Sequence, residues 1–175
     1  ASNRIHLGEV VATSNDGLTE SLMSTASALG EVLTRLSSIV DVDVSSNPIA
    51  DDQAAAFCAA LLAVPLQSHE GEPAFAVHAA VSPPALRYPA VGLRCLHLGG
   101  TAAGDMAAET CATALRQHPN LALSSLCLSS RVGDAGASAI ASALPHAPSL
   151  RELWLGDLLG DAAVDSFMAV LSDAD

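Results

Sequence analysis

The chain has 175 residues, of which half are apolar and 15% are charged, so it can bury the core of one domain and is not expected to be disordered. Its formal net charge is −12 and its seven cationic side chains are all Arg, which argues against a nucleic acid or an anionic membrane as partner. No apolar run approaches the roughly 20 residues that span a bilayer, and the first residues lack the order of a signal peptide. We therefore expect a soluble, intracellular protein of the cytoplasm.

In chain order, a strand–turn–helix frame recurs along the sequence, as in proteins built from stacked repeats. The apolar residues are mainly Ala and Leu, and aromatic residues make up only 3%, which suits thin core layers. Two copies precede residue 65: a degraded copy over 1–36 and a clearer copy over 37–64. Their expected strands and helices are Ile5–Leu7 with Leu18 to about Leu36, and Ile39–Val44 with 53–62.

The Pro-rich segment 65–90 interrupts the spacing. Asp52 and Asp105 are 53 positions apart, about one repeat more than the frame needs. The segment is a loop insertion or a degenerate repeat with a strand at Phe75–Val77, and we favour the degenerate repeat with a protruding loop.

Three clear copies follow, over 91–120, 121–148 and 149–175. Each has the pattern Leu-x-x-Leu-x-Leu, then Gly-Asp, then an Ala-rich helix. The aspartates stand 29 and 27 positions apart, which is a repeat of ordinary length. The core leucines of the strands are Leu93, Leu96, Leu98, Leu123, Leu126, Leu128, Leu150, Leu153 and Leu155, and the aspartates are Asp105, Asp134 and Asp161.

The pattern also predicts how each copy folds locally. A strand with alternate inward Leu and a helix with one apolar stripe bury both faces only when neighbouring copies stack. We expect the Asp of each Gly-Asp pair to be the N-cap of its own helix. Asn47 fits the turn position where the repeat favours Asn, whereas Thr101, Arg131 and Leu158 replace it, so those turns must close their hydrogen bonds differently. The expected helix stripes are Met106, Cys111, Ala114 and Leu115; Ile140 and Leu144; and Val164, Phe167, Met168 and Leu171.

The four cysteines form no C-x-x-C pair and no compact secreted framework, which predicts reduced thiols. The frame places Cys58 and Cys111 in helices and Cys95 and Cys127 in strands, each as a small apolar residue.

These motifs resemble the ribonuclease-inhibitor-like subclass of leucine-rich repeats, as in the run Gly133–Leu144. The resemblance covers Leu93–Leu171 strongly and Leu36–Leu62 moderately. It implies an α/β fold, namely a right-handed βα horseshoe solenoid with a parallel sheet on the concave side and helices on the convex side. The whole of 1–175 would then be a single leucine-rich-repeat domain of about five to six repeats, or a part of a longer chain.

The resemblance further implies binding rather than catalysis, because members of the subclass mostly recognise proteins through the concave sheet. The leading hypothesis is a non-catalytic protein-interaction module whose partner has a basic or polar surface. One alternative is a structural subunit of a large multiprotein assembly. Another is a regulator that inhibits or activates a partner enzyme such as a nuclease or a small GTPase, and this one rests on the resemblance alone.

The register of the core leucines assigns the outward strand positions to the concave surface. Trp154 is the first candidate for partner contact, since Trp is enriched in binding hot spots, and its alternative role is to cover the end of the core. The acidic candidates are equally consistent with a solvated face. A further outward row of small residues, Gly8, Ser45, Gly99, Ser129 and Gly156, would let a ligand approach the backbone. The partner-binding candidates are His6, Asp41, Asp43, His97, Cys127, Glu152 and Trp154.

Neither a metal site nor a catalytic site is expected. Cys95, His97 and Cys127 come nearest to a metal-binding group, but no second His or carboxylate is evident beside them, so ordinary surface residues are favoured. His6 and Asp43 can pair across neighbouring strands, yet such a pair needs a nucleophile to act as a triad. We therefore expect no cofactor, no metal ion and no catalytic residue.

Overall fold

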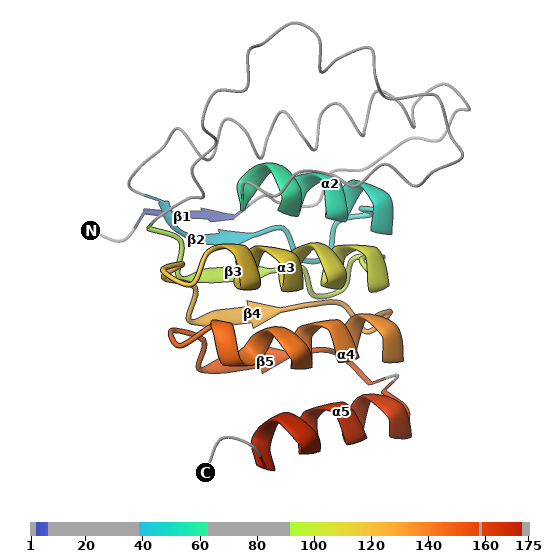
Figure 1. Ribbon diagram of the computed structural model, residues 1–175. Helices are drawn as coiled ribbons and strands as arrows, with labels where there is room; N and C mark the ends of the chain where they lie inside the picture. Colours follow the sequence, from blue (N-terminus) through green and yellow to red (C-terminus); the bar gives the residue numbers. More distant parts are fainter. Residues whose placement is uncertain (1–2, 7–38, 63–91, 158, 173–175) are drawn as a thin grey trace, which may run out of the picture.

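The computed structural model describes residues 3–6, 39–62, 92–157 and 159–172, and for residues 3–6 it describes the backbone alone (Figure 1). The elements in chain order are β1 (Asn3–His6), β2 (Ile39–Asp43), α2 (Asp51–Leu61), β3 (Cys95–His97), α3 (Asp105–Gln117), β4 (Ser125–Cys127), α4 (Asp134–Ala143), the short 3-10 helix η1 (Leu144–His146), β5 (Glu152–Trp154) and α5 (Asp161–Ser172).

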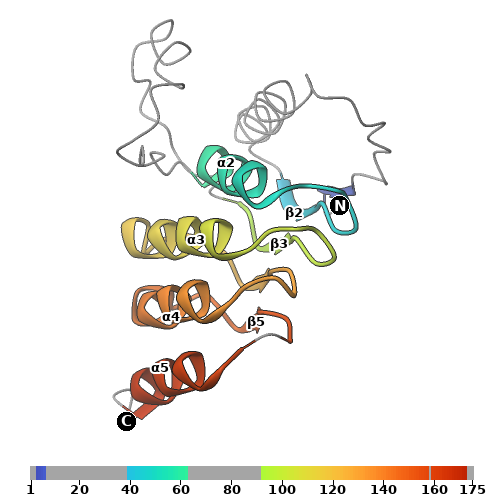
Figure 2. The ribbon, with the colours of Figure 1, turned by 90° about the vertical axis from the view of Figure 1, so that its right-hand side faces the viewer.

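The five strands form one sheet in chain order, and every neighbouring pair is parallel. Helices α2 to α5 lie side by side in the same order, and Figure 2 shows them all on one side of the sheet. The predicted α/β class with a parallel sheet is confirmed. The strand and helix of each expected copy after residue 37 fall inside 37–64, 91–120, 121–148 and 149–175.

The core lies between the sheet and the helices, and it is built from the predicted leucines. Leu93, Leu96 and Leu98 are fully buried, as are their equivalents in the next copy. Burying a Leu side chain contributes about 1.5–3 kcal/mol relative to leaving it exposed. In the last copy Leu150 and Leu153 are only partly buried, because β5 is the last described strand of the sheet.

The helices pack closely because their contact faces carry Ala and Gly. A Cβ atom added to Gly136 of α4 would lie 2.8 Å from the Cβ atom of Ala108 on α3, which is closer than real Cβ atoms approach. Ala108 and Ala112 of α3 and their equivalents Ala137 and Ala141 of α4 are completely buried. The high Ala content of the sequence is therefore explained by the narrow spacing between neighbouring helices.

The expectation that each Asp caps its own helix is wrong. Asp105, Asp134 and Asp161 are each the first residue of their helix, and Gly104 and Gly133 hold the N-cap positions of α3 and α4. The carboxylates of Asp105 and Asp134, and that of Asp51 at the same position of α2, instead accept hydrogen bonds from N–H groups at the start of the next helix in the stack, where the first turn has unsatisfied donors. The bonds run from Gly104 (2.7 Å), Met106 (3.1 Å) and Ala107 (3.0 Å) to Asp51, from Gly133 (2.8 Å) and Gly136 (3.0 Å) to Asp105, and from Gly160 (2.7 Å) to Asp134.

The turns after the strands close as their sequences require. Asn47 donates from its side-chain amide to the carbonyl of Val44 at 3.0 Å. At the equivalent position, the Thr101 hydroxyl donates to the carbonyl of Leu98 at 2.7 Å. In the copy that has Arg131 there, the Val132 N–H donates to the Ser129 carbonyl at 3.3 Å, and the Ser129 hydroxyl donates to the carbonyl of Thr101 in the preceding turn at 2.6 Å. The prediction of a different closure is confirmed for the Arg131 turn, whereas the Thr101 turn closes on the same carbonyl as the Asn47 turn. Leu158 lies outside the described residues.

Two members of the row of small residues have a packing role, and the expectation that the row lets a ligand approach the backbone stays a prediction for the others. Ser129 is completely buried. Gly156 has a φ of 79°, and a Cβ atom there would collide with the backbone of Ser130 in the preceding turn. Small residues are needed because the turns of neighbouring copies stack closely, and Gly8 lies outside the described residues.

Strand β2 pairs directly with β3, so no repeat stands between them in the sheet. A degenerate repeat in ordinary order would have separated these two strands. The loop-insertion alternative for 65–90 is therefore favoured over the degenerate repeat. The segment itself, with its expected strand at Phe75–Val77, lies outside the described residues, as does the helix expected from Leu18 to about Leu36.

All four cysteines are free and occupy the expected elements, with Cys58 and Cys111 buried in helices. A hydrogen bond with Cys111, together with burial, raises the pKa of the Cys58 thiol well above its ordinary value. Both thiols therefore serve as core side chains, as predicted.

Candidate functional site

The parallel register arranges the strand side chains in three rows across the sheet. The middle row contains the core residues Val42, Leu96, Leu126 and Leu153. We call the two outward rows together the open face. One row is Asp41, Cys95, Ser125 and Glu152, and the other is Asp43, His97, Cys127 and Trp154.

This register confirms that the outward positions predicted for β3, β4 and β5 align with one another. It also places Asp41 and Asp43 beside Cys95 and His97, which the expected degenerate repeat would have separated. It is fixed by burial, because Leu96 at 0% exposure must point toward the helices, and Cys95 and His97 on either side of it then point away from them. The backbones of Arg4 and His6 take the expected register positions beside Asp41 and Asp43, and their side chains lie outside the described residues.

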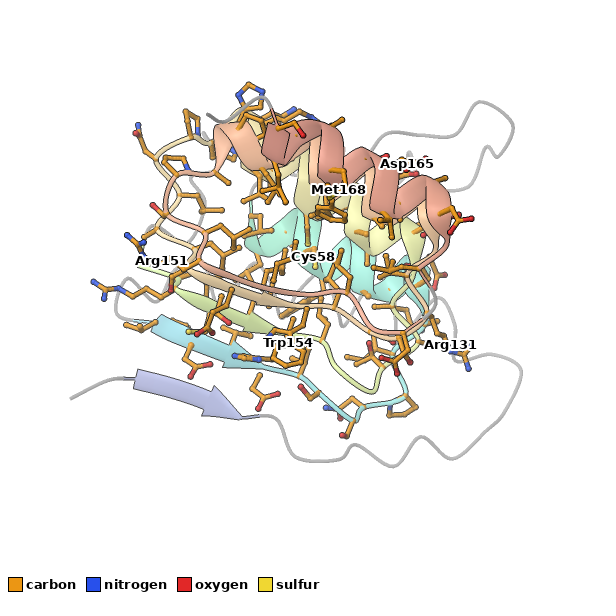
Figure 3. The ribbon with its side chains drawn as sticks, turned by 90° about the horizontal axis from the view of Figure 1, so that it is seen from below. Cys58, Arg131, Arg151, Trp154, Asp165 and Met168 are labelled. Atoms are coloured by element: carbon orange, nitrogen blue, oxygen red, sulfur yellow. The ribbon has the colours of Figure 1, made fainter. Side chains whose placement is uncertain are left out.

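The open face is most exposed on β5. Ser125 is buried and Asp41, Asp43, Cys95, His97 and Cys127 are half-buried, whereas Glu152 is exposed and the Trp154 side chain is 67% exposed. Figure 3 shows Trp154 on the side of the sheet away from the helices. At this exposure the ring covers little of the core, which favours contact with another molecule over the role of an end cap.

The second row has the order carboxylate, imidazole and thiol, in Asp43, His97 and Cys127, but the pKa of its thiol is not lowered as that of a nucleophilic Cys would be. The Asp43 carboxylate accepts a hydrogen bond from the Ser45 N–H at 3.0 Å, and the Cys127 thiol lies 3.9 Å from the Leu128 carbonyl, to which it donates, instead of bonding to His97. Burial raises the pKa of the Cys127 thiol, and the nearby Asp43 charge adds to this effect. A nucleophilic Cys needs the opposite shift.

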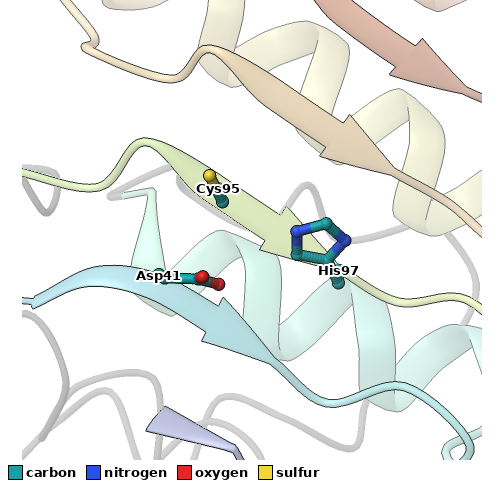
Figure 4. A group of neighbouring side chains, drawn as sticks. All are labelled: Asp41, Cys95 and His97. Carbon is teal, nitrogen blue, oxygen red and sulfur yellow. The ribbon is translucent and has the colours of Figure 1, made fainter. Parts of the chain in front are cut away.

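A different group on the open face has the chemistry of a metal site. The Asp41 carboxylate, the Cys95 thiol and the His97 imidazole offer ligand atoms that all lie within 4.8 Å of one another (Figure 4). The sequence argument named Cys95 and His97 but paired them with Cys127 and saw no adjacent carboxylate, and this was wrong. The internal alignment gives Asp41 and Cys95 equivalent strand positions, but only the direct pairing of β2 with β3 makes them neighbours.

A second exposed surface lies on the last unit. Val164, Met168 and Leu171 of α5 are 51%, 58% and 61% exposed, although they were expected on a core stripe. In α3 and α4 the equivalents of Val164 and Met168 are buried Ala residues that face the following helix. Helix α5 is the last described helix, so its corresponding face has no such cover. We call these three residues the C-terminal apolar surface.

The burial predicted for the other helix-stripe residues is confirmed for some of them and wrong for Met106. Cys111, Ala114, Leu115 and Ile140 are buried as expected, whereas Met106 is 42% exposed, because it lies at the second position of α3 on the side away from the core.

No protein-family model matches the chain, and a search of curated proteins finds no significant match. None of the helices in the described ranges is long and apolar enough to cross a membrane.

Proposed function

We propose that the chain is a leucine-rich-repeat solenoid of the ribonuclease-inhibitor-like subclass, and that its open face is the concave surface that binds a partner protein without catalysis. The observation that carries this proposal is the register, which gathers two outward rows from four strands and ends one of them on the exposed Trp154. A large exposed aromatic side chain beside polar residues is the usual composition of a binding hot spot.

The charge of the open face selects the kind of partner. Asp41, Asp43 and Glu152 lie on it, and the chain as a whole has a formal net charge of −12. Such a surface attracts a basic or polar protein surface, and it repels nucleic acids and anionic membranes. No cofactor is part of the proposal, and we place the binding in the cytoplasm, where the four free thiols stay reduced.

The experiment is affinity purification from native extract with mass spectrometry, in which the natural chain is compared with a Trp154→Ala, Asp43→Ala double variant. A matched control is the Met106→Ala, Asp165→Ala double variant, which removes one large apolar and one acidic side chain from the exposed surface of α3 and α5. The captured protein is then purified and titrated against all three chains.

We expect the Trp154 and Asp43 variant to bind at least about tenfold more weakly, since one hot-spot residue contributes 2 kcal/mol or more. The control should bind as the natural chain does. A partner that binds all three chains equally would refute binding through the open face.

A second candidate function, that of a structural subunit in a large assembly, is favoured by the C-terminal apolar surface. A neighbouring subunit would present a helix to α5 as α5 itself does to α4. A Val164→Ser, Met168→Ser variant tests it by sedimentation and by incorporation into native complexes. The assembly role predicts that this variant loses its neighbours while the Trp154 and Asp43 variant keeps them.

A further inference from the structure

Three potential metal ligands come from two adjacent strands of the open face. Asp41 lies on β2, and Cys95 and His97 lie on β3. Their ligand atoms are all within 4.8 Å of one another, and all three side chains are half-buried. They are thus partly shielded by the protein and still reachable by an ion from solvent (Figure 4).

The sheet, rather than a loop, holds this group together. Asp41 and Cys95 are direct register partners, and neighbouring strands lie about 4.8 Å apart. Cys95 and His97 are two residues apart on one strand, so they share a face, and the fully buried Leu96 between them fixes that face. Ligands carried by regular strands need little ordering when an ion binds.

We propose that Asp41, Cys95 and His97 bind a divalent zinc ion on the open face. Thiolate, imidazole and carboxylate are the three donor types that zinc takes in proteins, at about 2.0–2.3 Å. A tetrahedral arrangement at these lengths separates the ligand atoms by roughly 3.3–3.6 Å. Because the atoms lie within 4.8 Å of one another, the three side chains must close by at most about 1.5 Å. Mg²⁺ and Ca²⁺ are disfavoured because they require oxygen ligands, of which this group has one carboxylate.

The register neighbours of the group carry charges of both signs. The Asp43 carboxylate is the register neighbour of His97 and adds negative charge to the same face. Arg4 is the register neighbour of Asp41 on β1, on the side of β2 away from Cys95. Three protein ligands leave the fourth zinc position to water or to a donor from another molecule on the open face. The site does not depend on the proposed partner binding.

The test is a titration of the purified, reduced full chain with Co²⁺, followed by displacement with Zn²⁺. A thiolate ligand gives a charge-transfer band, and tetrahedral Co²⁺ gives intense visible bands. We expect one ion per chain. Cys95→Ser should abolish the charge-transfer band, and Asp41→Asn and His97→Gln should each weaken binding by more than about tenfold, since even outer-shell changes cost that much.

Matched controls stand beside the site on the same face. Cys127→Ser removes a thiol one register position away, and it should leave the band and the affinity within about twofold. Asp43→Asn removes a charge beside the site without removing a ligand, so it should keep the charge-transfer band and weaken binding less than Asp41→Asn does. Circular dichroism and thermal unfolding check that each variant is folded, and Asp41→Asn and His97→Gln decide the matter if Cys95→Ser does not fold. Absence of the band in the natural chain, or a band that Cys127→Ser removes and Cys95→Ser keeps, would overturn the proposal.

Discussion

The hydrogen bonds from Asp105 to the next helix allow a quantitative test of how neighbouring units are joined. One oxygen of the Asp105 carboxylate accepts the N–H groups of Gly133 at 2.8 Å and of Gly136 at 3.0 Å. Asp105→Ala removes both bonds and leaves two donors of the first turn of α4 without this acceptor. Hydrogen bonds to charged groups contribute about 1.5–3 kcal/mol, and loss of an N-cap costs about 0.5–2 kcal/mol. Because Asp105 is half-buried, we expect a loss of about 2 kcal/mol.

The matched control is Asp161→Ala, which removes the same residue from the equivalent position of α5. No described helix follows α5, so this substitution removes only the favourable interaction of the carboxylate with its own helix dipole, about 0.3–1 kcal/mol. Asp105→Asn keeps an acceptor oxygen without its charge. Its loss in free energy of unfolding should therefore fall between the losses of Asp105→Ala and Asp161→Ala.

Urea unfolding measures the three free-energy changes, and amide hydrogen exchange locates them. In Asp105→Ala the amides of Gly133 and Gly136 should exchange faster, whereas the Gly104 amide, which donates to Asp51, should be unaffected. Equal destabilisation by Asp105→Ala and Asp161→Ala would refute the idea that this carboxylate joins two units.

Three further outcomes are expected. Gly136→Ala should lower the unfolding temperature, because overpacking against Ala108 costs about 1–3 kcal/mol and outweighs the better helix propensity of Ala. A stabilised variant would mean that α3 and α4 can move apart to make room for the methyl group. Thr101→Val should cost about 1–3 kcal/mol in urea unfolding and Thr101→Asn much less, since Asn47 fills the equivalent turn; equal losses would contradict this. In a Cys95→Ser background, Cys127 should react with iodoacetamide only as the pH rises above the ordinary thiol pKa. The reason is that its raised pKa keeps the thiol protonated at neutral pH. Rapid alkylation of Cys127 at pH 7 would contradict this.

The sequence was sufficient for the βα units after residue 37, for the register among β3, β4 and β5, and for which strand residues lie on the open face. The reason is the period of two along a strand: once Leu96 and its equivalents must be buried, their neighbours have only the other face to occupy. The order of the strands followed because each clear copy begins with the same short pattern of leucines.

Only the tertiary structure decided the features that depend on a neighbour. Asp105 has the sequence context of a local N-cap, but the donors nearest to its carboxylate belong to the next unit. Val164 and Met168 have the spacing of a core stripe, yet burial needs a following helix, and α5 has none among the described residues. Likewise Asp41 approaches Cys95 and His97 only because β2 pairs directly with β3, despite the more than 50 positions that separate Asp41 from Cys95 in the chain. Local patterns determine which face a side chain takes, and packing between units determines what that side chain meets there.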